Sequence, residues 1–149
     1  MRAHIIYFSR NNGVAVDCPV DIVFVLDESV SIGSSDFNLM KSFLSRLVGR
    51  LDIDNGNTRV GLITFSSSAT PRFNLGAHST VGSVQSAISS ISRYSGGTNI
   101  AAALRFVRTT MLTSAAGDRP NVPNVVVVLT DGKSLSSGTQ VSKKYINET

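Results

Sequence analysis

The sequence predicts one α/β domain with a doubly wound, mostly parallel open sheet and helices on both faces. Two runs of apolar, largely β-branched residues, at 22–26 and 125–129, have the composition of strands buried on both sides. Between them lie segments with apolar residues at helical spacing and a pair of strand-like segments. The resulting order is strand, helix, hairpin, helix, helix, strand, which is typical of a sheet covered on both faces.

The strand at 22–26 is followed by the longest predicted helix. Its apolar residues recur on one helical face: Phe37, Met40, Leu44, Leu47, Val48 and Leu51. The turn-forming stretch DIDNGN, residues 52–57, ends this helix. Two strands are predicted next, at 58–66 and 69–75, close enough in the chain to form a hairpin. Pro71 places the second at an edge of the sheet, because proline lacks the amide hydrogen that a central strand donates.

Two shorter helices precede the last strand. The apolar faces of these two helices consist of Val81, Val84, Ile88 and Ile91 in the first, and of Ile100, Leu104, Val107 and Met111 in the second. The stretch RYSGGTNI, residues 93–100, lies between them. The strand at 125–129 then repeats the pattern of the first strand, since both are apolar runs that lead to an aspartate.

Composition excludes several classes of protein. The 149 residues are the size of one domain, and no apolar run approaches the roughly 20 residues of a membrane span, so no membrane insertion is predicted. Cys18 is the only cysteine, which excludes an internal disulfide and a cysteine-based zinc cluster. The net charge of +4 comes from scattered basic residues. That charge fits a solvated surface or an acidic partner such as a sulfated glycan, and no motif supports nucleic-acid binding.

Oxygen-bearing side chains follow the two buried strands. Asp27 and Asp131 come at the carboxyl ends of these strands, which meet at one edge of a parallel sheet. Ser29 and Ser31 follow Asp27, and the glycines of SGGTN bring Thr98 to a third loop. Hard oxygen ligands without histidine or cysteine suit Mg²⁺, and also Mn²⁺ or Ca²⁺. Each motif taken alone is also ordinary loop composition; together they predict a metal site.

The chain resembles a von Willebrand factor type A domain, the fold of integrin inserted domains, matrilins and many collagens. The D-x-S-x-S motif stands at residues 27–31, the threonine loop at 96–99 and the final acid motif, TDG, at 130–132. These motifs occur in the family's order and at similar spacing. The resemblance covers residues 20–134, and NVPNVVVVLTDGKS is similar to the extracellular matrix members.

The resemblance implies a metal-ion-dependent adhesion site, or MIDAS. Ser29, Ser31 and Thr98 would then be direct ligands, while Asp27 and Asp131 would act directly or through water. An open coordination position would accept an acidic side chain of an extracellular matrix protein such as collagen. By the same resemblance the protein would be extracellular, although no signal peptide is visible. Glu28, between two motif positions, is expected to point away from the metal as a structural or surface residue.

An enzyme is the alternative class, specifically a Mg²⁺-dependent hydrolase or phosphatase on a similar sheet. The haloacid-dehalogenase phosphatases need a second acid two residues after the first, and Ser29 occupies that position here. A phosphate-binding P-loop ending in DGKS needs a glycine where Val127 stands. No histidine lies near a candidate nucleophile, so acyl transfer lacks its base. We therefore expect a binding module and not an enzyme.

Three regions are predicted: an N-terminal leader or linker at 1–19, a partial type A domain at 20–134 and a polar C-terminal tail at 135–149. The resemblance implies that the last strands and helices of the domain are missing from the chain. It also implies that Cys18 would pair with a cysteine in that missing part. The strand at 125–129 is therefore expected to have an unprotected apolar edge, which would make the chain poorly stable and prone to associate.

Overall fold

The computed structural model describes residues 2–8 and 19–131. These residues form a five-stranded sheet in the order β1-β5-β2-β3-β4. The strands are β1 (Arg2–Phe8), β2 (Val20–Asp27), β3 (Thr58–Phe65), β4 (Ala69–Phe73) and β5 (Asn124–Thr130). The central strands β5, β2 and β3 are parallel, while β1 and β4 run antiparallel along the two edges. The predicted open, mostly parallel sheet is confirmed, and Pro71 lies on an edge strand as expected.

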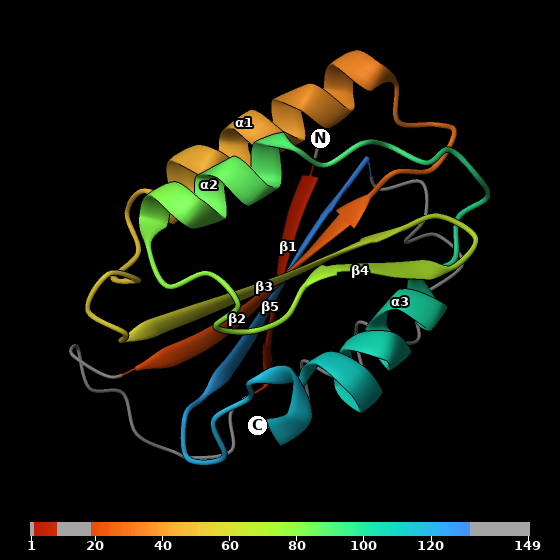
Figure 1. Cartoon of the computed structure of the whole chain (residues 1–149). Coiled ribbons are helices and arrows are strands. Elements are labelled where there is room, and N and C mark those ends of the chain that lie inside the picture. Colours follow the sequence, from red (N-terminus) through yellow and green to blue (C-terminus); the bar gives the residue numbers. More distant parts are fainter. Residues whose placement is uncertain (1, 9–18, 132–149) are drawn as a thin grey trace.

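Helices cover both faces of the sheet. On one face α1 (Ser34–Val48) and α2 (Val81–Ser89) lie side by side, and on the other α3 (Ile100–Phe106) continues into a π-helical turn (Val107–Met111). Figure 1 shows this arrangement, with α1 and α2 above the sheet and α3 below it. A short 3₁₀ turn (Ser114–Ala116) leads towards β5. In the part of the chain that the structure describes, no helix is both long and apolar enough to cross a membrane.

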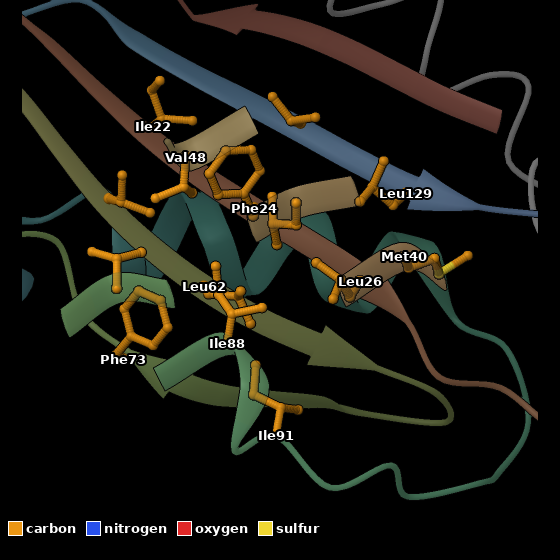
Figure 2. Close-up of a cluster of buried hydrophobic side chains, with 14 of the residues drawn as sticks. Ile22, Phe24, Leu26, Met40, Val48, Leu62, Phe73, Ile88, Ile91 and Leu129 are labelled. Carbon is orange, nitrogen blue, oxygen red and sulfur yellow. The ribbon is translucent and has the colours of Figure 1, made fainter. Parts of the chain in front are cut away.

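Each face of the sheet has its own apolar core. Phe24 and Leu26 of β2 pack with Leu62 of β3 beneath α1 and α2 (Figure 2). Val23 and Val25, which alternate with them along β2, pack on the opposite face beneath α3. Because side chains alternate along a strand, an unbroken apolar run can fill both cores. This double burial explains why β2 and β5 lack the alternating pattern of a half-exposed strand.

The parallel register brings polar residues together at both ends of β2 and β5. Asp21 of β2 lies opposite Asn124 of β5, and Leu26 lies opposite Leu129. One step further along, Asp27 is therefore next to Thr130. The apolar middle of the sheet is thus bounded at each end by a buried carboxylate, and both carboxylates belong to β2.

The outer edge of β5 is covered by β1, so the expectation of an unprotected edge at 125–129 was wrong. The pairing is antiparallel and extends from Arg2 opposite Thr130 to Phe8 opposite Asn124. Strand β1 lies in the region predicted from the sequence to be a leader or linker. The division of the chain into 1–19, 20–134 and 135–149 stays a prediction. Cys18 and the polar tail lie outside the described residues.

Candidate metal centre

Asp27 ends β2 and is fully buried. Its Oδ1 accepts a hydrogen bond from the backbone amide of Ser29 at 2.9 Å, and its Oδ2 accepts one from the Thr130 hydroxyl at 2.8 Å. These two donors come from the loop after β2 and from the end of β5, so they fix the carboxylate in one orientation. Thr130 is not among the site residues predicted from the sequence.

Two of the predicted ligand hydroxyls lie together. Ser29 Oγ and Ser31 Oγ are 3.1 Å apart, close enough for either to donate to the other. Ser29 is buried and Ser31 is exposed, so the pair extends from the interior to the surface at the end of β2. Since the amide of Ser29 also binds Asp27, the carboxylate and the hydroxyl pair form one connected unit.

The loop that carries Thr98 lies against residues 28–31. The amide of Val30 donates to the carbonyl oxygen of Gly96 at 2.9 Å, which joins the two loops directly. One residue after Thr98, the side chain of Asn99 accepts a hydrogen bond from the backbone of α3 at 3.0 Å and caps that helix. Thr98 itself is exposed. Thr98 therefore lies between Gly96, which is bonded to Val30, and Asn99, which caps α3.

A third loop, after β3, supports the threonine loop and was missed from the sequence. The carbonyl oxygen of Ser66 accepts from the amide of Asn99 at 2.8 Å, and Ser67 Oγ accepts from the amide of Gly97 at 2.8 Å. A Cβ atom on Gly96 would lie 2.9 Å from Ser66 Oγ and 3.2 Å from Ser66 Cβ, so any other residue there would force the Ser66 side chain to move. A run of serines at the carboxyl end of a parallel strand was the available signal.

Asp131 directly follows β5 and is half-buried, beside the Thr130 that binds Asp27. The two acids thus come to the same edge of the sheet, as the strand pattern predicted. Among residues 2–8 and 19–131 no group of three or more histidine, cysteine, aspartate or glutamate side chains could hold a metal ion. The hydroxyls of Ser29 and Ser31, 3.1 Å apart, lie at this same end of β2.

Glu28 lies inside the protein and not on its surface. Its side chain is 1% exposed and its Oε2 accepts hydrogen bonds from Arg72 Nη2 at 3.1 Å and from the amide of Tyr94 at 2.9 Å. Of the two roles expected for Glu28, structural or surface, the structure supports the structural one. Neither arginine near this loop was predicted to contribute: Arg72 binds Glu28, and Arg93 Nη2 donates to the carbonyl oxygen of Ser29 at 3.0 Å.

Comparison with known proteins gives one family. A family model described as von Willebrand factor type A domain matches residues 21–148. Matrilin-1 of Mus musculus is 39% identical over 129 residues, which is 85% of this chain and 26% of the relative. The collagen alpha-4(VI) chain of Mus musculus is 39% identical over 118 residues, covering 78% of this chain and 5% of the relative. The chain therefore spans at most about a quarter of these two relatives.

Solved structures with the same fold include proximal thread matrix protein 1 of the mussel byssus. One crystal form aligns with a TM-score of 0.74 at 24% identity, over 87% of this chain and 36% of that one, which shows the fold alone. A second structure of that protein, described as having a zinc-occupied MIDAS motif, aligns with a TM-score of 0.64 at 26% identity, over 80% of this chain and 28% of that one.

Proposed function

The chain belongs to the von Willebrand factor type A domain family, and we propose that it is a divalent-metal-dependent adhesion module. The proposed ligands are Ser29, Ser31 and Thr98, with Asp27 and Asp131 supplying negative charge directly or through water. The observation that carries this proposal is the connected unit at the end of β2. There the Asp27 carboxylate binds the amide of Ser29 at 2.9 Å, and the hydroxyls of Ser29 and Ser31 lie 3.1 Å apart.

The donor set suits a hard cation. Hydroxyl and carboxylate oxygens are the ligands that Mg²⁺, Mn²⁺ and Ca²⁺ prefer, and Mg²⁺ is our first choice. The related mussel protein, with zinc in its MIDAS motif, supports a divalent ion without selecting among them. In this chain the bonds from Ser29 and Thr130 hold Asp27 in place, so its charge has a fixed position relative to the hydroxyl pair.

Neutral ligands explain how such a site would bind a partner. Hydroxyl oxygens do not cancel the charge of a divalent cation, so the bound cation would offer positive charge and an open position to a carboxylate. Exposure of Ser31 and Thr98 puts two of the proposed ligands at the surface, where a partner's acidic side chain can reach. We therefore propose recognition of an aspartate or glutamate on another protein.

The partner is proposed to be an extracellular matrix protein such as collagen, and the chain itself to be extracellular. Support comes from its relatives, which include matrilin-1, a collagen chain and a byssus thread matrix protein. We propose no enzymatic activity. Within the alternative class of Mg²⁺-dependent hydrolases and phosphatases, a phosphatase of the haloacid-dehalogenase type would require a second acid in the place of Ser29, whose amide and hydroxyl are both engaged in the unit described above. Phosphate release from a generic phosphoester with Mg²⁺ would favour that alternative instead.

Metal titration tests the site. We expect calorimetry to detect Mg²⁺ or Mn²⁺ binding to the wild type. The metal affinity of Ser29→Ala and of Asp27→Ala should be at least about tenfold lower, because even the loss of a residue that only supports a metal ligand typically lowers affinity by that factor. The control is Ser42→Ala, an exposed position on α1, which should bind as the wild type does. Equal affinity in all four proteins would refute the assignment of the ligands.

Partner binding should depend on the metal. We expect adhesion of the protein to a collagen-coated surface to be lost in EDTA and restored by excess Mg²⁺, because the proposed contact is between the cation and a carboxylate. The Ser29→Ala variant should adhere poorly even with Mg²⁺, while Ser42→Ala should adhere normally. Adhesion that persists in EDTA but falls with added salt would indicate a metal-independent contact made by the positively charged surface.

A further inference from the structure

Glu28 joins three segments that are far apart in the sequence. It follows Asp27 at the end of β2, and its Oε2 accepts hydrogen bonds from Arg72 of the edge strand β4 and from the amide of Tyr94, in the loop before Thr98. The side chain is 1% exposed. A carboxylate in this position is thus a direct link between the loop that carries Ser29 and the loop that carries Thr98.

Arg72 is itself held in place by neighbouring groups. Its Nε donates to the Thr64 hydroxyl of β3 at 2.8 Å, and its Nη2 donates to the carbonyl oxygen of Ser92 at 3.1 Å as well as to Glu28. The guanidinium carbon lies 5.3 Å from the centre of the Tyr94 ring, a distance at which a cation is attracted to an aromatic face. Arg72 therefore neutralises Glu28 and also contacts the loop of residues 92–94.

Further bonds join the same two loops closer to the proposed ligands. Arg93 Nη2 donates to the carbonyl oxygen of Ser29 at 3.0 Å, and the amide of Val30 donates to the carbonyl oxygen of Gly96 at 2.9 Å. Together with the bond from Tyr94 to Glu28, these contacts extend along residues 28–30 on one side and 93–96 on the other. The two loops are thus fixed relative to each other beside the candidate metal centre.

Two polar atoms in this cluster, Glu28 Oε1 and Arg93 Nε, are buried and have no hydrogen-bond partner among residues 2–8 and 19–131. Buried polar atoms are nearly always hydrogen-bonded, because an unpaired one loses its interaction with water and gains nothing in return. Replacing Glu28 alone with an apolar residue would in turn leave Arg72 and the amide of Tyr94 without this acceptor. The buried carboxylate is thus tied to the two segments that donate to it.

We propose that Glu28, Arg72 and Arg93 are positioning residues for the metal centre. They hold the loop of residues 92–98 against residues 28–31, so that Thr98 is presented to the same cation as Ser29 and Ser31. Metal binding then needs little further ordering of the loops, and this pre-organisation raises affinity. This inference rests on the proposed function, because it assigns the residues a role at that same site.

The test compares two buried carboxylates that each pair with an arginine. Glu28→Gln keeps the shape of the side chain and an oxygen for Tyr94 but removes the charge that binds Arg72. Asp21→Asn makes the same change at the opposite end of β2, where Asp21 is paired with Arg119. Both variants are titrated with Mn²⁺ by calorimetry, and backbone amide exchange is measured without metal. Glu28→Gln should bind Mn²⁺ roughly 10–100-fold more weakly and exchange faster at residues 28–31 and 92–98.

Asp21→Asn should lower the melting temperature but leave Mn²⁺ affinity and exchange at those two loops unchanged. Wild-type affinity and exchange in Glu28→Gln would overturn the positioning role and leave the proposed function intact. An equal loss of affinity in both variants would also overturn it, because the effect would then be general destabilisation. A wild type that binds no metal would refute the proposed function itself. If Glu28→Gln does not melt cooperatively, Arg72→Lys replaces it with the same expected results, since lysine keeps the charge but cannot span Thr64, Glu28 and Ser92.

Discussion

Replacing Arg119 with alanine is expected to lower the free energy of unfolding by about 3–5 kcal/mol, because it removes the partner of a buried carboxylate. Asp21 is 0% exposed, and the Arg119 side chain donates to its Oδ1 from Nε at 2.8 Å and from Nη2 at 2.6 Å. The same guanidinium also donates to the carbonyl oxygens of Val20, Gly56 and Asn57. Its loss leaves the buried carboxylate without its charged partner and with the backbone amide of residue 119, which donates to Asp21 Oδ2 at 2.8 Å, as its remaining donor from that residue. Urea unfolding measures the effect.

Arg105→Ala is the matched control for this prediction. Arg105 is an exposed arginine on α3, and removing it should change stability by no more than about 0.5 kcal/mol. Because Arg119 lies at the end of β2 opposite the candidate metal centre, the Arg119→Ala variant should retain wild-type metal affinity as long as it is folded. If Arg119→Ala unfolds at a urea concentration close to the midpoint of Arg105→Ala, the ion pair between Asp21 and Arg119 contributes little to stability, as exposed ion pairs do.

Deleting residues 1–8 is expected to change the oligomeric state of the protein. The deletion removes β1 and opens the edge of β5, whose residues 125–129 are all apolar. An open apolar edge strand offers unpaired amide and carbonyl groups to other chains, so the shortened protein should self-associate. Size-exclusion chromatography over a range of concentrations should show a monomer for the full chain and larger species for the deletion variant.

A synthetic peptide with the sequence of residues 2–8 provides the corresponding rescue. If β1 protects the edge by pairing with it, the peptide added in excess should occupy β5 and reduce association, as strand addition does elsewhere. A peptide of the same composition in scrambled order is the control. A deletion variant that stays monomeric and melts at the wild-type temperature would show that β1 is dispensable for covering β5.

Most elements of the fold could be predicted because their signals are local. The alternating or unbroken apolar patterns of β2, β3 and β5 and the helical spacing in α1 and α2 depend only on neighbouring residues. Strand β1 could not be predicted in this way. Its partner β5 lies at the other end of the described chain, and its own sequence, RAHIIYF, reads as a short apolar patch. Pairing over such a distance depends on the completed sheet.

In the candidate site, too, contacts between segments far apart in the sequence could not be predicted. Asp27, Ser29 and Ser31 stand out in the sequence because all three lie within one stretch of five residues. The bond between Thr130 and Asp27, and the support that Ser67 gives to Gly97, join loops from different strands. No sequence spacing reports such contacts. Serines and threonines are also common in loops for ordinary reasons, so their roles become visible only when the strands are placed side by side.

The position of β5 has a consequence for how the chain folds as it is synthesised. In the sheet β5 lies between β1 and β2, yet it is the last strand of the described residues to be made. At about 5–20 residues per second, the roughly 100 residues that separate β2 from β5 take on the order of 5–20 s to emerge from the ribosome. Throughout that interval β1 has no strand to pair with and one edge of β2 stays open. Of the strands in the described residues, β1 and β2 therefore acquire their shared neighbour last, and the order β1-β5-β2 can form only after β5 has been made.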